Sequence, residues 1–177
     1  KLSANGTFIG THILTPSEGV SVQINAYNFP VWGMMEKLST SLLAGVPAIV
    51  KPATPGSYLT NAVFQDMIES GILPEGAIQL VCGEPGNILD YVQDGDSVLF
   101  TGSASTGKKL KSLPSVSTNA VRFNMEADSL NCSILGLDAK PGTPEFDLFI
   151  KEVRTEMTTK AGKKCTAIRR IIVPENL

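Results

Sequence analysis

Short apolar runs alternate with segments of helical period along most of this chain, and no other feature restricts its fold as strongly. Apolar runs predict strands at residues 20–25, 48–50, 78–82, 97–100 and 120–125. Patterns of helical period predict helices between them, at residues 34–44, 58–69, 88–93 and 106–111. A chain that alternates strands with helices favours a parallel sheet covered by helices on both faces. We therefore predict an α/β fold built on an open, mostly parallel sheet.

Two stretches lie outside this alternating unit. An apolar pattern at residues 7–14 predicts a strand within a lead-in segment, residues 1–16. The last part of the chain predicts a strand at 133–135, a loop rich in Pro and Gly at 139–144, a helix at 145–160 and a strand at 168–173. We therefore predict a Rossmann-like domain at residues 17–126 and the start of a second α/β domain at residues 127–177.

Composition excludes several classes of function. The chain has 177 residues, with 15 basic and 17 acidic side chains, so its net charge of −2 gives no electrostatic reason to expect a nucleic-acid partner. No apolar run is long enough to span a bilayer and no signal peptide is visible, so we expect no membrane partner. Three cysteines without regular spacing favour a reducing, cytoplasmic location, with Cys82 and Cys132 buried as small hydrophobic residues. The single histidine, His12, excludes a multi-histidine zinc site, and we expect no metal.

The third cysteine, Cys165, stands in a different setting. Gly162, Lys163 and Lys164 precede it and Thr166 follows it, which is not the surrounding of a core cysteine. Nearby cations stabilise a thiolate, and the thiolate is the form that attacks carbonyl carbon atoms. A solvated basic turn is the alternative interpretation.

Residues 100–107 join a predicted strand to a predicted helix and contain two glycines, Gly102 and Gly107. Such a turn can bring backbone N–H groups and a helix N-terminus close to a phosphate, although an ordinary strand-to-helix turn is the alternative. The same residues come near a P-loop, because Lys108 follows Gly107. Lys109 then stands where a P-loop needs Ser or Thr to hold Mg²⁺, so the sequence disfavours an NTPase.

Three more polar residues follow predicted strands, where parallel sheets bind their ligands. Glu126 can act as a general base that activates water, or it is a surface glutamate at a strand exit. The amide of Asn28 can donate to an oxyanion, or Asn28 simply forms a turn. Lys51 can contact a phosphate or a ribose, or it is a solvated strand end.

Taken in order, five pieces of the chain resemble the aldehyde dehydrogenase superfamily. They are residues 28–30, 44–52 and 100–107, together with Glu126 and Cys165, and they span nearly the whole chain. The resemblance implies that Cys165 is the nucleophile, Glu126 the general base and Asn28 the oxyanion donor. It further implies a nucleotide-binding domain at 17–126, the N-terminal part of a catalytic domain at 127–177, and a cofactor site that includes Lys51, Thr54, Gly83, Gly102, Ser103 and Gly107.

Residues 124–131 and 161–170 are similar, within that superfamily, to dehydrogenases of bacterial phenylacetate degradation that are fused to a ring-opening hydratase. This similarity implies a CoA-linked semialdehyde as substrate, although nothing in this chain matches the hydratase. Two departures stand out. Residues 127–130 read Ala-Asp-Ser-Leu where most of the superfamily has Leu-Gly-Gly-Lys. Thr54 stands where an acidic residue usually repels a 2′-phosphate, so we predict that NADP is accepted, with NAD also possible.

The implied mechanism is attack by the Cys165 thiolate on the aldehyde, hydride transfer to the nicotinamide, and hydrolysis of the resulting thioester by water that Glu126 activates. The superfamily's catalytic domain continues well beyond its nucleophile, whereas Cys165 lies close to Leu177, the last residue of this sequence. We therefore expect a truncated catalytic domain that turns over little aldehyde alone, and a homo-oligomeric full-length protein. A nucleotide-binding α/β module without chemistry of its own is the alternative.

Overall fold

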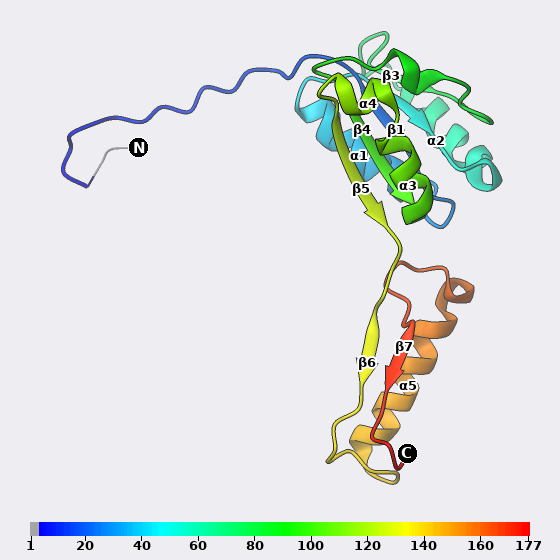
Figure 1. The fold of residues 1–177 in the computed structure, drawn as a ribbon. Helices are drawn as coiled ribbons and strands as arrows, with labels where there is room; N and C mark the ends of the chain where they lie inside the picture. The colour runs from blue at the N-terminus through cyan, green and yellow to red at the C-terminus, as the bar shows by residue number, and fades with distance from the viewer. Residues whose placement is uncertain (1–3) are drawn as a thin grey trace.

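The computed structural model describes residues 4–177, and it confirms the predicted α/β fold (Figure 1). Five strands form one sheet in which every neighbouring pair is parallel. They are β1 (Ser21–Ile24), β2 (Ala48–Lys51), β3 (Ile78–Leu80), β4 (Ser97–Gly102) and β5 (Arg122–Ala127). Their order in space is β3-β2-β1-β4-β5, so the direction in which strands are added reverses between β1 and β4.

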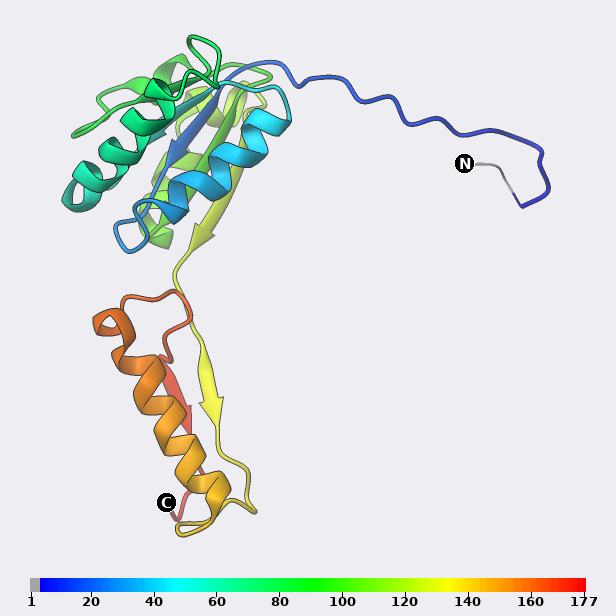
Figure 2. The same ribbon diagram turned by 180° about the vertical axis from the view of Figure 1, so that it is seen from behind.

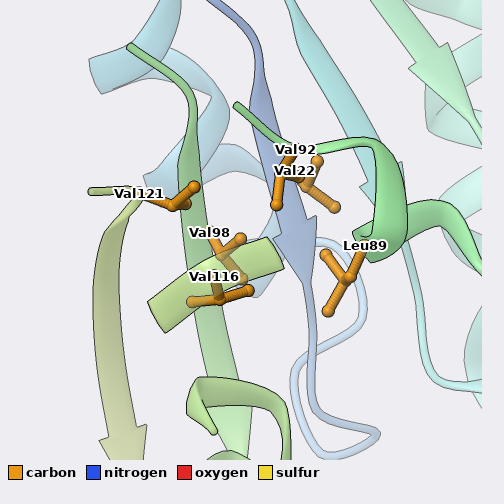
Figure 3. Packing of buried hydrophobic residues seen from close by; sticks show 6 residues of the cluster. All are labelled: Val22, Leu89, Val92, Val98, Val116 and Val121. Carbon is orange, nitrogen blue, oxygen red and sulfur yellow. The ribbon is translucent and has the colours of Figure 1, made fainter. Parts of the chain in front are cut away.

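Helices cover both faces of this sheet, as the sequence predicts. On one face, α1 (Trp32–Leu43) and α2 (Ser57–Glu69) pack over a core of Met34, Leu38, Ala48, Val50, Phe64 and Ile78. On the other lie η2 (Ile88–Tyr91), α3 (Ala104–Lys111) and α4 (Pro114–Thr118), over the core that Figure 3 shows: Val22, Leu89, Val92, Val98, Val116 and Val121. Each buried side chain of this size stabilises the fold by roughly 1.5–3 kcal/mol. The inner strands β1, β2 and β4 contain no exposed side chain and read as short, largely apolar runs, which is why the sequence pattern located them, whereas the edge strand β5 is mostly exposed.

After β5 the chain leaves the sheet and forms a smaller unit (Figures 1 and 2). It consists of β6 (Cys132–Ile134), α5 (Pro144–Thr158), η3 (Thr159–Gly162) and β7 (Arg170–Ile172). The strands β6 and β7 are parallel, and α5 lies beside them. The side chain of Thr143 caps α5 by accepting a hydrogen bond from the Phe146 N–H at 3.3 Å. No helix within residues 4–177 is long and apolar enough to cross a membrane.

The predicted strand at residues 7–14 is wrong. These residues form an exposed arm that extends away from the sheet, with an isolated bridge at Ile9 (Figures 1 and 2). The apolar pattern is suited to a strand, but a strand needs a neighbouring strand, and the arm lies along neither edge of the five-stranded sheet. Residues 1–3 of the predicted lead-in segment lie outside the described residues.

Two cysteines also differ from the expectation. Cys82 and Cys132 are exposed, as Cys165 is, and all three are free thiols. Cys82 lies beyond the end of β3, which stops at Leu80, and Cys132 opens β6 in the smaller unit. An apolar neighbourhood in sequence therefore did not imply burial at either position.

Candidate active site

A cavity of about 520 Å³ opens where the strand order reverses, at the carboxyl edge of the sheet. In open parallel sheets this is where ligands bind, because the chains that follow the two neighbouring strands turn toward opposite faces and leave a crevice. Four segments that are distant in sequence meet there. The wall comprises residues 24–28 at and after the end of β1, 100–103 and 106 from the end of β4 into α3, 126–129 at and after the end of β5, and 163–165 and 169 in the smaller unit, together with Ala53.

The position of Glu126 follows from the register of the sheet. Glu126 on β5 pairs with Thr101 on β4, so the two side chains lie side by side at the carboxyl edge. The Thr101 hydroxyl donates a hydrogen bond to Glu126 Oε2 at 3.5 Å. The carboxylate is exposed to the cavity and its surroundings, so it remains accessible to water and to a substrate.

Cys165 is held by its backbone in what we call the Cys165 loop, residues 159–165. The Asn131 side chain donates one hydrogen bond to the Cys165 carbonyl oxygen at 2.6 Å and another to the Ala167 carbonyl oxygen at 3.3 Å. The predicted cationic surrounding is only partly present, because the Lys164 ammonium forms an ion pair with Glu156 at 2.9 Å. The thiol itself is exposed and lines the cavity.

Asn28 lines the same cavity and comes from a third segment of the chain. It lies in what we call the Asn28 turn, residues 25–31, between β1 and α1. Its side-chain Nδ2 donates a hydrogen bond to the carbonyl oxygen of Lys163 in the Cys165 loop at 2.8 Å. The structure thus brings together Asn28, Glu126 and Cys165, the three residues predicted to be catalytic, on one cavity wall.

The turn after β4 lines the cavity through Gly102 and Ser103. Ser103 caps α3, since its hydroxyl oxygen accepts a hydrogen bond from the Thr106 N–H at 3.3 Å. Gly107 instead is buried against the sheet, where a Cβ would overlap Met125 Sδ and lie 3.0 Å from the Phe100 ring. Close packing therefore explains why position 107 is a glycine, whereas the predicted contact of Gly107 with a cofactor stays a prediction.

The remaining residues of the predicted cofactor site do not line this cavity. Lys51 ends β2, Thr54 begins the short helix η1 (Thr54–Gly56), and Gly83 follows β3 with a φ of +86°. All three lie at or just beyond the carboxyl ends of strands on the β2 and β3 side of the crevice. Ala53, next to Thr54, does line the cavity, so this group is adjacent to the site.

Sequence reasoning missed a second, smaller cavity of about 200 Å³ on the α1 side. Phe29, Trp32, Gly33 and Glu36 contribute its far wall. The near wall is shared with the larger cavity and consists of Ala26, Asn28, Thr101, Glu126 and Cys165. Part of the signal was present, because Trp32 and Glu36 are four apart and therefore lie on one face of α1.

Asp128 is another residue whose role the sequence did not disclose. It has a φ of +52°, in the left-handed region that favours glycine but that Asp tolerates better than most residues. Its carboxylate accepts a hydrogen bond from the Ala104 N–H at 3.2 Å, at the start of α3. The departure at residues 127–130 therefore places a carboxylate beside the turn after β4. Residues 4–177 contain no group of three or more His, Cys, Asp or Glu side chains that could hold a metal ion.

Comparison with known proteins decides the family. Residues 5–177 match the aldehyde dehydrogenase family. The chain belongs to this family. It is 54% identical over 173 residues to the 3,4-dehydroadipyl-CoA semialdehyde dehydrogenase of Aromatoleum evansii, covering 98% of this chain and 34% of that protein. It is 30% identical over 163 residues to the alpha-ketoglutaric semialdehyde dehydrogenase of Bacillus subtilis, covering 90% of this chain and 32% of that protein.

Solved structures agree with this family assignment. An oxidoreductase from Marinobacter aquaeolei superposes with a TM-score of 0.78 at 27% identity, over 91% of this chain and 33% of that one. The betaine aldehyde dehydrogenase of Staphylococcus aureus in complex with NAD⁺ has a TM-score of 0.75 at 26% identity, over 89% of this chain and 30% of that one. The predicted family is therefore confirmed, and the chain spans about a third of the length of the curated relatives it matches.

Proposed function

We propose that the protein carrying this sequence oxidises an aldehyde to a carboxylic acid with NAD(P), through a thioester on Cys165. The observation that carries this proposal is the common wall of the two cavities, where a thiol, a carboxylate and a carboxamide from three distant segments come together. A thiol nucleophile, an amide donor for the oxyanion and a carboxylate base for water are the groups that this two-stage oxidation requires.

Each residue has one part in this mechanism. The Cys165 thiolate attacks the carbonyl carbon, and the Asn28 amide together with the Cys165 backbone N–H stabilises the resulting oxyanion. NAD(P), when bound, supplies the acceptor for the hydride that the carbonyl carbon loses. The acyl group is then a thioester on Cys165, and Glu126 removes a proton from the water that hydrolyses it. One aldehyde, one oxidised cofactor and one water give one acid, one reduced cofactor and one proton.

Three features of the larger cavity support the binding of a dinucleotide there. Gly102 and Ser103 line it at the N-terminus of α3, where the helix dipole favours a negative charge. Two cations of the smaller unit, Lys163 and Arg169, also line it and can contact phosphate groups. We propose that Thr54, which is exposed and uncharged, leaves room for the 2′-phosphate of NADP, so that NADP is accepted as well as NAD.

The smaller cavity suits the aldehyde, and its charge suggests which aldehydes it takes. The Glu36 carboxylate lines this cavity, while Lys37 pairs with it at 3.2 Å. A substrate with a free carboxylate brings a second negative charge toward Glu36, whereas a thioester at the same position is neutral. We therefore propose a CoA-linked semialdehyde, which agrees with the name of the relative from Aromatoleum evansii.

The test uses the full-length protein that carries this sequence, with a six-carbon aldehyde presented as its CoA thioester and as its free acid. We expect formation of reduced cofactor with the thioester and slower formation with the acid. Replacing Glu36 by Gln should raise kcat/KM for the acid about fivefold, which corresponds to roughly 1 kcal/mol, and should leave kcat/KM for the thioester within twofold of the wild-type value. Cofactor binding without reduction by either compound would favour a nucleotide-binding module and refute the proposal.

We further propose that residues 1–177 alone turn over little aldehyde, because Cys165 and both cavities are open to solvent in this structure. Rapid formation of reduced cofactor by the isolated chain would contradict this. We also propose that the full-length protein is a cytoplasmic homo-oligomer. The free thiols and the exposed apolar side chains of the arm, such as Ile13 and Leu14, support this, and sedimentation would test the oligomeric state.

A further inference from the structure

The Cys165 loop contains three successive residues with left-handed backbone angles. Lys160 and Ala161 have φ angles of +52° and +54°, and Gly162 follows with +71°. This region costs a residue with a side chain about 1 kcal/mol or more. At the third position the sequence supplies the residue that the geometry needs, because a Cβ on Gly162 would lie 2.9 Å from the Met157 carbonyl oxygen. The first two residues keep this conformation only because other contacts stabilise it.

The Lys160 side chain makes two such contacts, both with the Asn28 turn. Its ammonium donates a hydrogen bond to the Asn28 carbonyl oxygen at 2.8 Å. The same ammonium lies 3.7 Å from the centroid of the Phe29 ring, which is a cation–π contact. The two residues are 132 positions apart in sequence, so Lys160 connects the smaller unit directly to the turn after β1.

The Asn28 turn also donates a hydrogen bond back to the Cys165 loop. While Lys160 binds the backbone of Asn28, the Asn28 side chain donates to the Lys163 carbonyl oxygen at 2.8 Å. A carboxamide carries two N–H donors, so this bond orients the amide with one N–H and leaves the other for a substrate oxygen. Lys163 is two residues before Cys165, and the orientation of the amide is therefore tied to the backbone that carries the thiol.

We propose that Lys160 is a positioning residue that fixes the Asn28 amide relative to the Cys165 thiol. Lys160 acts through Asn28, by holding the turn in place, and it makes no contact with the aldehyde. The loop keeps its left-handed residues because this conformation directs the Lys160 side chain to the Asn28 turn. The inference rests on the proposed function, since it concerns the group that stabilises the oxyanion formed when Cys165 attacks.

The experiment uses the full-length protein with the CoA-linked aldehyde as probe, and wild-type activity is measured first. An inactive wild-type protein would refute the proposed function, whereas an active one allows the inference to be judged separately. Lys160→Met removes the ammonium and keeps a long apolar stem, and Lys160→Arg keeps a cationic donor. Lys151→Met is the matched control, because Lys151 is an exposed lysine on α5, away from both cavities.

We expect the rate of the first turnover to fall roughly tenfold to a hundredfold in Lys160→Met, with KM for the aldehyde within about threefold of wild type. Lys160→Arg should retain most of the rate, and Lys151→Met all of it. An equal loss in the Met and Arg variants, or a first-turnover rate within twofold of wild type in Lys160→Met, would overturn the proposal. If Lys160→Met does not fold, Lys160→Gly replaces it, because glycine adopts the left-handed angle without strain.

Two further measurements separate positioning from a general structural role. Alkylation of Cys165 by iodoacetamide needs the thiol but no oxyanion donor, so its rate in Lys160→Met should stay within about threefold of wild type. In an Asn28→Ala background, Lys160→Met should cause little further loss of the aldehyde reaction, because the residue through which it acts is gone. An alkylation rate that falls as much as the aldehyde reaction, or a full further loss in the Asn28→Ala background, would refute the role assigned to Lys160.

Discussion

Replacement of Glu126 by Gln should separate the two halves of the reaction. The amide of glutamine keeps the length and shape of the side chain but cannot take a proton from water. Attack by Cys165 and loss of hydride do not need this carboxylate, so the first turnover should proceed. Hydrolysis of the thioester needs it, so the acyl group should accumulate on Cys165.

The size of the effect follows from the position of Glu126. A positioned general base contributes about 10²–10⁴ in rate, which corresponds to roughly 3–5 kcal/mol of activation free energy. The free energy of unfolding should change much less than the activation free energy. Within residues 4–177 the carboxylate accepts one hydrogen bond, from Thr101 at 3.5 Å, at the limit of hydrogen-bond distance, and the glutamine oxygen can still accept it. Activity should therefore fall while the free energy of unfolding stays within about 0.5 kcal/mol.

The assay is rapid mixing of the full-length variant with cofactor and aldehyde. We expect a burst of reduced cofactor close to one per active site, followed by a steady state at least a hundredfold slower than wild type. Mass spectrometry of the quenched protein should find the acyl group on the peptide that contains Cys165. Glu152→Gln, on the exposed surface of α5, is the control and should behave as wild type. Steady-state turnover of the Glu126 variant within twofold of wild type would refute its role as the base.

Three other changes test separate parts of the structure. Thr54→Glu should raise the Kd for NADP about tenfold and leave the Kd for NAD within threefold, because a carboxylate repels the 2′-phosphate. Titration with both cofactors measures the two Kd values, and an equal shift in both would contradict the assignment of Thr54 to the 2′-phosphate site. Gly107→Ala should lower the free energy of unfolding by about 1–3 kcal/mol, because the new methyl group overlaps Met125 Sδ; an unchanged urea midpoint would disprove the packing argument. Asn131→Ala removes the bond to the Cys165 carbonyl oxygen, so amide hydrogens of the Cys165 loop should exchange faster by mass spectrometry; unchanged exchange would contradict its anchoring role.

The sequence predicted the sheet well because each strand contains apolar residues and the three inner strands β1, β2 and β4 contain no exposed side chain, although β1 also buries Ser21 and Gln23 and β5 at the edge is mostly exposed. It also predicted that polar residues after different strands meet, since parallel strands end at one edge. Thr101 and Glu126 are an example, because the register of β4 and β5 places them side by side. What the sequence could not give is which side of the crevice each residue occupies, so Lys51 and Gly102 were assigned to one site although only Gly102 lines the cavity.

The errors have physical causes as well. The arm at residues 7–14 has the pattern of a strand, but pairing depends on a partner that a local pattern does not reveal. The sequence did not indicate a role for Lys160, because lysine is unfavourable in the left-handed region and nothing local predicts that angle. The tertiary contact with the Asn28 turn explains the angle, and a local pattern does not reveal such a contact. The packing of α3 on the sheet requires a glycine at position 107, a reason that the local pattern did not disclose, and the predicted contact of Gly107 with a phosphate stays a prediction.

The two cavities share one wall, and Cys165 lies on that wall. A group bound to Cys165 therefore borders both cavities. Under the proposed function, the aldehyde can occupy the smaller cavity and the cofactor the larger one, so that the reduced cofactor can depart while the acyl group is still attached. Its departure would open the larger cavity to water beside Glu126 at the stage when water is required. The timing of hydrolysis would then be governed by the exit of the cofactor, with no moving lid needed to admit the water.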